Sequence, residues 1–286
     1  GEITRSFLSR MITRLESEQS VKEYLDIMDH RKTEQLIDTL DKVEQNRKEC
    51  YIREFSIEHF HDSKVFETLI PKICKIFREE NEELTGFENE EILAEYQIYK
   101  TPGYVYMKGN VQIYSAGKQA ADISAFPEGI AVAVGSEEDV PDICPDQTID
   151  KVFTIENLTS FYRFKQEHSL VIYLGGYHNR SRRNLLMQIY QKLPDAQYYH
   201  FGDLDAGGFY ILEHLKRKTG IPFQMFQMDI ETLKKYEDYA KPLTENDKKR
   251  LMQLEKMELP DEERKLITYM LQKGIKLEQE CISKSQ

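Results

Sequence analysis

Apolar residues recur every three or four positions through the first third of the chain. Between Ser6 and Glu49 charged residues separate them, and neither glycine nor proline interrupts the pattern. This spacing predicts two or three amphipathic helices. The block 52–77 repeats the helical spacing, with a break near residues 61–63. The acidic run between residues 79 and 95 is expected to form a solvated face that repels DNA phosphate.

The hydrophobic period changes after residue 103. Residues 104–126 and 129–135 are rich in β-forming residues that glycines interrupt, which predicts short strands and a hairpin. Helices followed by a hairpin are compatible with a winged-helix module, although composition alone does not establish one. Two prolines among acidic residues make 137–148 a candidate linker.

Beyond residue 150, apolar strand-like runs alternate with helical patterns. Strands are expected at 151–157, 169–177, 196–201 and 222–228, and helices at 182–193 and 208–220, the latter closed by Gly220. Such alternation predicts an α/β domain with a mostly parallel sheet. The expected organisation is a helical segment over 1–48, a mainly helical winged-helix-like (CAP-like) domain over 49–140 and the α/β domain over 150–286.

Composition narrows the function classes. With 286 residues, 40% of them hydrophobic, the chain is long enough for two domains with buried cores. A net charge of -11 argues against indiscriminate binding of polyanions, unless basic residues are concentrated where a nucleic acid lies. The four cysteines follow no disulfide or zinc pattern, and neither a membrane span nor a signal peptide is recognisable, so a cytoplasmic protein is expected.

Three carboxylates follow two of the predicted strands. Asp203 and Asp205 come after the strand 196–201 and precede a glycine pair, and Glu156 ends the strand that begins at residue 151. Because the carboxyl ends of parallel strands share one edge of a sheet, the three side chains are expected to converge. A divalent cation would offset their repulsion, and Mg²⁺ or Mn²⁺ prefers oxygen ligands. The alternative is a solvated turn in which one aspartate caps the following helix.

The blocks "VFTIEN" and "GDLDAGGFYIL" resemble a Toprim domain, the α/β fold of topoisomerases, primases and several nucleases. That fold is marked by one glutamate and a DxD motif at the ends of separate strands. With "REFSIEHFHDSK", "ENLTSF", "GGYHNRSRRNLL" and "KLEQE", the blocks resemble the C-terminal part of the JetD family. That family supplies the nuclease subunit of Wadjet plasmid-defence systems and is related to the A subunit of topoisomerase VI. The resemblance covers most of residues 50–286.

The resemblance implies that Glu156, Asp203 and Asp205 are the catalytic, metal-binding residues, with Mg²⁺ or Mn²⁺ as cofactor. Glu278 and Glu280 of the terminal motif, and His200 just before the DxD motif, are candidates for additional ligands or supporting contacts.

One departure from the related topoisomerases bears on the reaction. Where those proteins carry the nucleophilic tyrosine pair, this chain has Ser56 and Ile57. Covalent strand passage is therefore not expected, and water becomes the expected attacker.

A basic stretch lies between two of the predicted strands. Residues 175–193 include Arg180, Arg182 and Arg183 and no acidic residue, a pattern suited to DNA phosphate contacts. Lys64, in the "DSK" block, is a further candidate for DNA contact. The alternatives are a solvated helix start for the arginine stretch and, for the "DSK" block, a helix cap formed by Asp62 or Ser63.

The expected function is a metal-dependent DNA endonuclease that acts as the effector of a Wadjet system. By the resemblance, its partners are double-stranded plasmid DNA and an SMC-type motor complex, and the chain is expected to be a homodimer that does not bind membranes. Two other classes stay open, namely a phosphatase with a DxD nucleophile and a non-catalytic or partner-activated DNA-binding module related to the topoisomerase VI A subunit.

Overall fold

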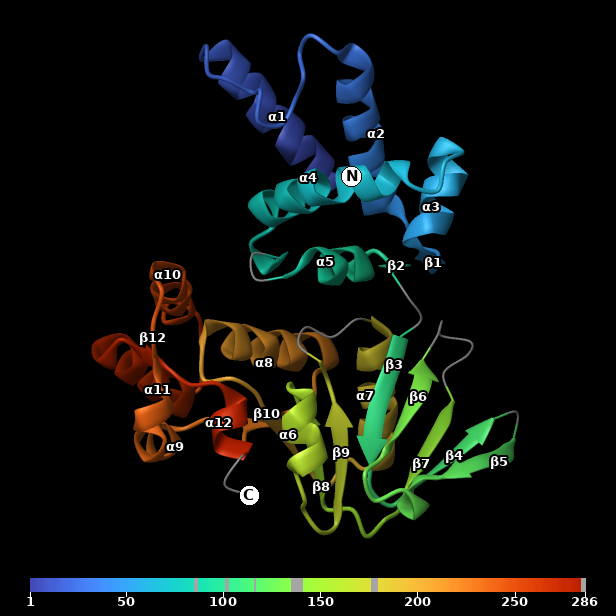
Figure 1. Cartoon of the computed structure of the whole chain (residues 1–286), viewed down its shortest axis with the longest axis vertical. Coiled ribbons are helices and arrows are strands. Elements are labelled where there is room, and N and C mark those ends of the chain that lie inside the picture. Colours follow the sequence, from blue (N-terminus) through green and yellow to red (C-terminus); the bar gives the residue numbers. More distant parts are fainter. Residues whose placement is uncertain (85–86, 101–102, 116, 135–140, 176–179, 284–286) are drawn as a thin grey trace. The chain divides into compact units, whose positions relative to one another are not determined.

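The chain has a mixed α/β fold that divides into two compact units, residues 1–102 and residues 103–286 (Figure 1). The computed structural model describes residues 1–84, 87–100, 103–115, 117–134, 141–175 and 180–283.

The first unit is mainly helical. Its elements are α1 Glu2–Glu16, α2 His30–Gln45, β1 Cys50–Tyr51, α3 Ile52–Phe60, α4 Val65–Glu80, the 3-10 turn Glu82–Leu84, α5 Asn89–Glu95 and β2 Ile98–Tyr99. The two short strands pair in parallel. α1 and α2 match the helices expected between residues 6 and 49, since their buried positions, such as Phe7 and Met11 on α1, recur at helical spacing.

The acidic run at the end of α4 is less solvated than expected. Glu79 and Glu80 form ion pairs with Arg10 of α1, and the Glu80 side chain is only 6% exposed. These carboxylates therefore hold the helices of the first unit together as well as carrying charge.

The second unit is built around a six-stranded sheet with the order β11-β10-β8-β9-β3-β6. Its strands are β3 Gly103–Lys108, β6 Ile130–Val134, β8 Lys151–Ile155, β9 Ser169–Tyr173, β10 Gln197–Phe201 and β11 Gln224–Met225. The four strands from β11 to β9 run parallel, and β3 runs antiparallel to both of its neighbours, β9 and β6. The parallel part agrees with the predicted α/β alternation.

Helices and small sheets complete this unit. They are α6 Leu158–Arg163, α7 Arg180–Lys192, α8 Ala206–Thr219, α9 Ile230–Lys235, α10 Glu245–Leu254, α11 Asp261–Lys273 and α12 Gln279–Ser283, with β12 Lys241–Pro242 paired to β13 Ile275–Lys276. α8 ends at Gly220, which adopts the left-handed conformation (φ 70°), as the sequence predicts. β11 is much shorter than the strand expected over 222–228, with only two residues in the ladder.

The strands between residues 103 and 145 differ most from expectation. β3 pairs with β9 and β6, so β3 and β6 belong to the same sheet as the parallel α/β strands. The compact units divide at residue 102, whereas the expected boundaries were near 48 and 140–150. Val105 and Met107 are buried on β3, which explains why it stays with the large sheet.

The candidate linker over 137–148 contains a strand. β7 Asp142–Pro145 pairs with β4 Val111–Ser115, which also pairs with β5 Lys118–Asp122 in a three-stranded sheet. Ile143 is fully buried there, so ladder bonds and burial outweigh the prolines that suggested a linker.

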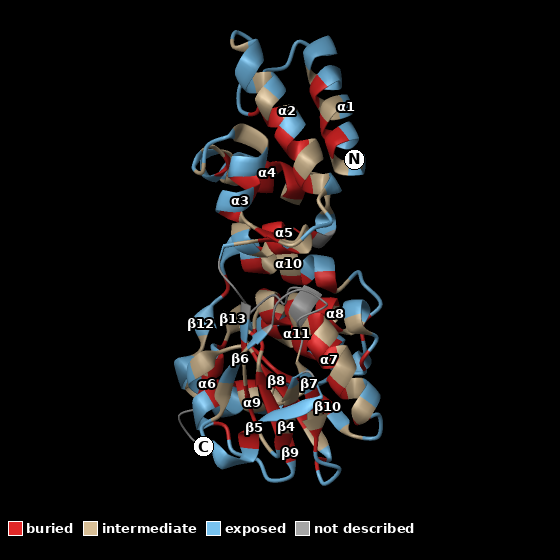
Figure 2. Cartoon of the chain, turned by 90° about the vertical axis from the view of Figure 1, so that its right-hand side faces the viewer, coloured by how far each residue is buried: buried red, intermediate tan, exposed pale blue. Residues whose placement is uncertain are grey.

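The core of the second unit lies on and beside the parallel strands (Figure 2). Phe153, Phe161 and Phe201 are at most 1% exposed and belong to one apolar cluster with α8, α10 and α11. Burial of several aromatic side chains of this size contributes strongly to stability, at about 1.5–3 kcal/mol for each large apolar side chain. The rigid strand ends that this core supports carry the carboxylates described below.

None of the helices in the described part of the chain combines the length and the apolar character needed to cross a membrane.

Candidate active site at the carboxyl edge of the sheet

Three neighbouring strands end at the same level in the large sheet. Ile155 of β8 pairs with Phe201 of β10 on one side and with Tyr173 of β9 on the other. The Glu156 backbone N–H donates to the Phe201 carbonyl oxygen at 3.1 Å, which extends the ladder by one more bond. The residues that follow β8 and β10 are therefore brought side by side, as the sequence predicts.

The carboxylates at this edge contact the neighbouring backbone. The Asp203 N–H lies 3.4 Å from Glu156 Oε2, and the Gly208 N–H donates to Asp205 Oδ1 at 2.9 Å. Asp205 thereby serves as the N-cap of α8, which was the alternative considered for this motif. The positive end of the α8 dipole favours a negative group at the same place.

Close packing between the DxD motif and α8 requires glycine at position 208. A Cβ built at Gly208 would lie 2.2 Å from the Asp203 carbonyl oxygen, and no other atom would be as close. Gly202 is similarly confined, because a Cβ there would lie 2.7 Å from Glu156 Oε2 and 2.9 Å from His200 Nε2. Gly208 therefore lets α8 approach the Asp203 backbone closely, and Gly202 lets the end of β10 approach the Glu156 carboxylate.

Gly208→Ala is expected to shift the start of α8 away from Asp203 and lower the free energy of unfolding by about 2 kcal/mol, because the overlap is with backbone that cannot rotate away. Urea unfolding followed by circular dichroism would measure the change. Gly207→Ala is the matched control, since its Cβ would meet Asp205 Oδ1 at 3.1 Å, the end of a side chain. Equal effects of the two substitutions would contradict this account.

The C-terminal segment adds a residue that sequence reasoning missed. Gln279, fully buried, donates from Nε2 to the Phe201 carbonyl oxygen (2.9 Å) and accepts the Asn157 N–H at Oε1 (2.9 Å). Its own backbone N–H donates to Asp203 Oδ1 at 2.7 Å. Leu277 and Leu204 also exchange backbone hydrogen bonds at 2.9 and 3.1 Å. Gln279 thus links both carboxylate-bearing strand ends, and its place inside "KLEQE" was the only available sign of this role.

Gln279→Met is expected to lower the free energy of unfolding by about 2 kcal/mol, since it leaves the partly buried Asn157 N–H and the buried Phe201 carbonyl without their side-chain partner. Hydrogen exchange would report the loss locally, as faster exchange of the Asn157 amide. Gln272→Met, on the exposed surface of α11, is the control. Unchanged protection of Asn157 in Gln279→Met would refute the linking role.

The two glutamates of the terminal motif lie on either side of Gln279. Glu280 Oε1 accepts a 2.6 Å hydrogen bond from Asn157 Nδ2, and Glu278 Oε1 lies 2.5 Å from Lys241 Nζ. Glu280 therefore contacts the residue next to Glu156, whereas Glu278 forms a surface ion pair.

The electrostatics of Asp203 reflect this acidic surrounding. The pKa of its carboxyl group is raised from 3.8 to about 6, mainly by burial and also by the nearby charges of Asp205, Glu280 and Glu278. The hydrogen bond from the Gln279 N–H acts in the opposite direction. Asp203 would consequently bind a cation favourably, because a positive charge would relieve the repulsion.

His200 is fully buried under the same edge. Its Nδ1 lies 3.0 Å from Thr154 Oγ1, and its Nε2 makes no hydrogen bond with the described residues. Burial lowers the pKa of His200 to about 3, and the charge of Lys216 adds to this, so the imidazole is neutral near pH 7. The expected supporting position is compatible with this burial, although no direct bond joins His200 to the aspartates.

The carboxylates at this edge are only partly arranged for a divalent cation. Within the described ranges, no three His, Cys, Asp or Glu side chains converge closely enough to hold a metal ion. In both aspartates Oδ1 is the oxygen bonded to a backbone N–H. The chemistry still fits Mg²⁺ or Mn²⁺, since the carboxylates are hard oxygen donors on adjoining strand ends, and one of them has a raised pKa.

The basic residues occupy different environments. Arg182 Nη1 donates to the Leu174 carbonyl oxygen at 2.8 Å, directly after β9 and at the carboxyl edge. Arg183 is only 8% exposed, so little of its guanidinium is left for a DNA phosphate. Its charge also acts on His214 of α8, whose pKa is lowered mainly by burial and then by Arg183. The Arg180 side chain lies outside the described part of the structure. Lys64 is exposed in the first unit, where its backbone N–H donates to Asp62 Oδ1.

Ser56 has a structural explanation. It is fully buried, its Oγ donates to the Asp62 carbonyl oxygen (2.5 Å), and it accepts the Phe66 N–H (3.0 Å). These bonds fix the turn between α3 and α4, which leaves the hydroxyl unsuited to act as a nucleophile. Ile57 is 53% exposed and has no nucleophilic atom.

Comparison with known proteins identifies the family. A family model described as "Wadjet protein JetD, C-terminal" matches residues 138–286. The Wadjet protein JetD of Bacillus cereus (strain Q1) is 28% identical over 263 residues, which cover 90% of this chain but 63% of the relative. The chain thus spans less than two thirds of that relative's length. Because the family model matches more than half of the residues of this chain, the chain belongs to the Wadjet protein JetD family.

Proposed function

We propose that this chain is a Mg²⁺- or Mn²⁺-dependent DNA endonuclease and the effector of a Wadjet plasmid-defence system. The observation that carries the proposal is the level ending of β8 and β10, which sets Glu156 beside the DxD motif, with Asp203 N and Glu156 Oε2 3.4 Å apart. The resemblance to Toprim nucleases and the family membership support it.

The residues of the site have distinct tasks in this reaction. Glu156, Asp203 and Asp205 would hold the cation, which when bound orients the phosphodiester and stabilises charge on the leaving oxygen. Glu156 also accepts or donates a proton during hydrolysis. Gln279 fixes the two strand ends, and Arg182, which is hydrogen-bonded at the end of β9, would contact a DNA phosphate.

Hydrolysis is favoured over covalent strand passage. The Ser56 hydroxyl is hydrogen-bonded to the backbone of Asp62 and Phe66, and Ile57 has no nucleophilic atom. Water therefore attacks phosphorus, the bond from phosphorus to the leaving oxygen breaks, and that oxygen takes up a proton.

The partners of this reaction follow from the resemblance alone. They are double-stranded plasmid DNA and an SMC-type motor complex that presents it, with a homodimer of this chain supplying two sites for a two-strand cut. A cytoplasmic location would accompany them.

One observation favours a second function. Asp205 caps α8, and the described side chains do not assemble a ligand set of three residues. Both observations would be expected of a non-catalytic or partner-activated DNA-binding module. In that case the acidic edge is a structural turn until a partner docks.

Cleavage of supercoiled plasmid tests both functions. The chain is incubated with Mg²⁺, with Mn²⁺ and with EDTA, alone and with purified SMC-type partner complexes, and the products are separated on agarose gels. Metal-dependent linear DNA is the expected result. Intact plasmid in every reaction that contains the partners, together with retained DNA binding, would favour the non-catalytic module.

A further inference from the structure

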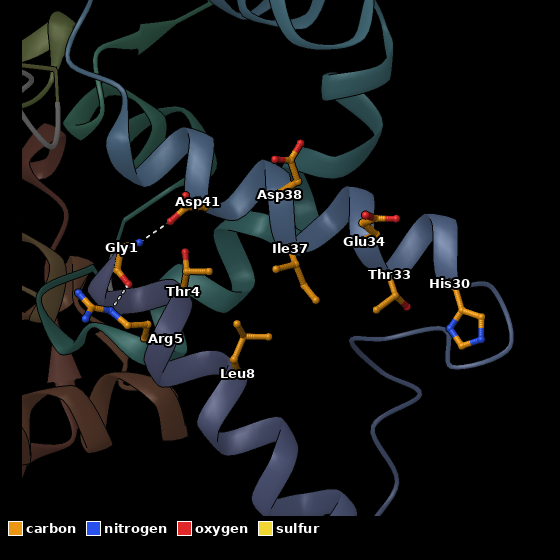
Figure 3. A pocket seen from close by; sticks show the side chains of 10 residues that line it. All are labelled: Gly1, Thr4, Arg5, Leu8, His30, Thr33, Glu34, Ile37, Asp38 and Asp41. Carbon is orange, nitrogen blue, oxygen red and sulfur yellow. Dashed lines mark hydrogen bonds and ion pairs between the residues drawn. The ribbon is translucent and has the colours of Figure 1, made fainter.

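A groove of about 720 Å³ lies between the first two helices of the chain, within the first unit. α1 contributes Thr4, Arg5 and Leu8, and α2 contributes Thr33 and Ile37 among others (Figure 3). Leu8 and Ile37 project into the space between the helices (Figure 3). These two side chains give the groove an apolar floor, which no other side chain among the described residues fills.

Beyond the groove, the apolar side of α1 continues with two residues that do not line it, Ile12 and Leu15. Leu8, Ile12 and Leu15 are spaced by four and three residues, so they lie on one side of the helix, while Phe7 and Met11 face the core. Ile12 is 55% exposed and Leu15 47% exposed. Apolar residues that share one side of a helix and are at least partly exposed are typical of a surface that a partner covers, whereas isolated exposed apolar residues are ordinary.

The opposite edge of the groove is acidic. Glu34, Asp38 and Asp41 lie on α2 at helical spacing and line the groove. Asp38 pairs with Lys42 and Asp41 with the amino group of Gly1, so the acidic edge is only partly neutralised. Residues 1–102 contain 23 Asp or Glu and 15 Lys or Arg, a net charge of -8 out of -11 for the chain. DNA is repelled by such a surface, and a basic partner is attracted.

We propose that this groove binds a basic amphipathic helix of a partner protein. The apolar face of that helix packs on Leu8, Ile12 and Ile37, and lysine or arginine side chains on its flank lie along Glu34, Asp38 and Asp41. Two diverging helices with an apolar floor suit the helix-in-groove mode of recognition. This interaction surface is separate in sequence and in chemistry from the carboxylate site, and it does not depend on the proposed nuclease activity.

A defined peptide tests the proposal on the full chain. The probe is a fluorescein-labelled helix of three heptads with leucine on one face and lysine on both flanks, and its binding is followed by fluorescence anisotropy. Ile12→Gln is expected to weaken binding about tenfold, since it removes apolar contact at an exposed position where folding is unaffected. Glu34→Lys should weaken it too, with a larger effect at low salt. Thr13→Gln, exposed on the next position of α1, should leave binding unchanged.

Three outcomes would overturn the proposal. The first is absence of binding by the lysine peptide, and the second is equal binding of a peptide with glutamate in place of every lysine. The third is a dimer in multi-angle light scattering that Ile12→Gln abolishes, because it would assign the groove to a second copy of this chain. Plasmid cleavage by Ile12→Gln is measured in parallel, so that failure of the nuclease proposal is recognised separately.

Discussion

Replacement of Asp203 by asparagine is expected to lower the rate of plasmid cleavage by about three orders of magnitude. Loss of one ionised ligand weakens cation binding and removes charge stabilisation at the reacting phosphate, and effects of two to three orders of magnitude per group are typical of such sites. Asparagine keeps the shape of the side chain and an oxygen that can accept the Gln279 N–H. The rate is measured as the appearance of linear plasmid under saturating Mg²⁺.

Two comparisons make this result specific. Glu156→Gln should lose as much activity, because Glu156 lies at the neighbouring strand end. Glu258→Gln, an exposed acidic position of the same unit, should retain full activity and controls for loss of charge alone. Cleavage by Asp203→Asn at the rate of the Glu258→Gln control would show that the DxD motif has only a structural role.

The same substitution is expected to stabilise the fold near neutral pH. The pKa of Asp203 rises from 3.8 to about 6 on folding, so the folded state holds more protons than the unfolded state between these values. The free energy of unfolding consequently falls as the pH rises through this window, and a shift of this size corresponds to about 3 kcal/mol. Asp203→Asn lacks that ionisation and should be more stable than the wild type by about 2 kcal/mol at pH 7.5 in EDTA.

Urea unfolding at pH 4 and pH 7.5 separates this effect from a general one. The advantage of Asp203→Asn should disappear at pH 4, where the wild-type carboxyl is protonated in the folded state. Glu258→Gln should behave like the wild type at both pH values. An Asp203→Asn protein less stable than the wild type at pH 7.5 would show that ionised Asp203 does not destabilise the folded state in its buried, acidic surroundings.

Much of the α/β unit could be predicted from local pattern. The runs at 151–155 and 197–201 are apolar and bounded by polar residues, and Gly220 ends α8 as a left-handed cap. The pairing of β3 with β9 could not be predicted, because the hydrophobic period of a strand does not specify which other strand it pairs with. For the same reason the pairing of β7 with β4 could not be predicted. Ile143 of β7 is buried beside β4 although prolines flank the segment.

The candidate site could be predicted only in part. Glu156 and the DxD motif were recognisable because parallel strands end at one edge, and the structure places them there. Gln279 could not be identified, since its three hydrogen bonds join residues more than 70 positions away in the chain. Arg183 was assigned to DNA from the local charge of its segment, which does not reveal that α7 turns this residue inward.

Binding of Mn²⁺ tests the central claim most directly, because it requires no DNA and no partner. Electron paramagnetic resonance measures free Mn²⁺ as the ion is titrated into the wild type, Glu156→Gln, Asp203→Asn and the Glu258→Gln control. We expect a site in the wild type and the control whose affinity falls at least tenfold in Glu156→Gln and in Asp203→Asn. The same affinity in all four proteins, or no binding in any, would contradict a metal centre formed by these carboxylates.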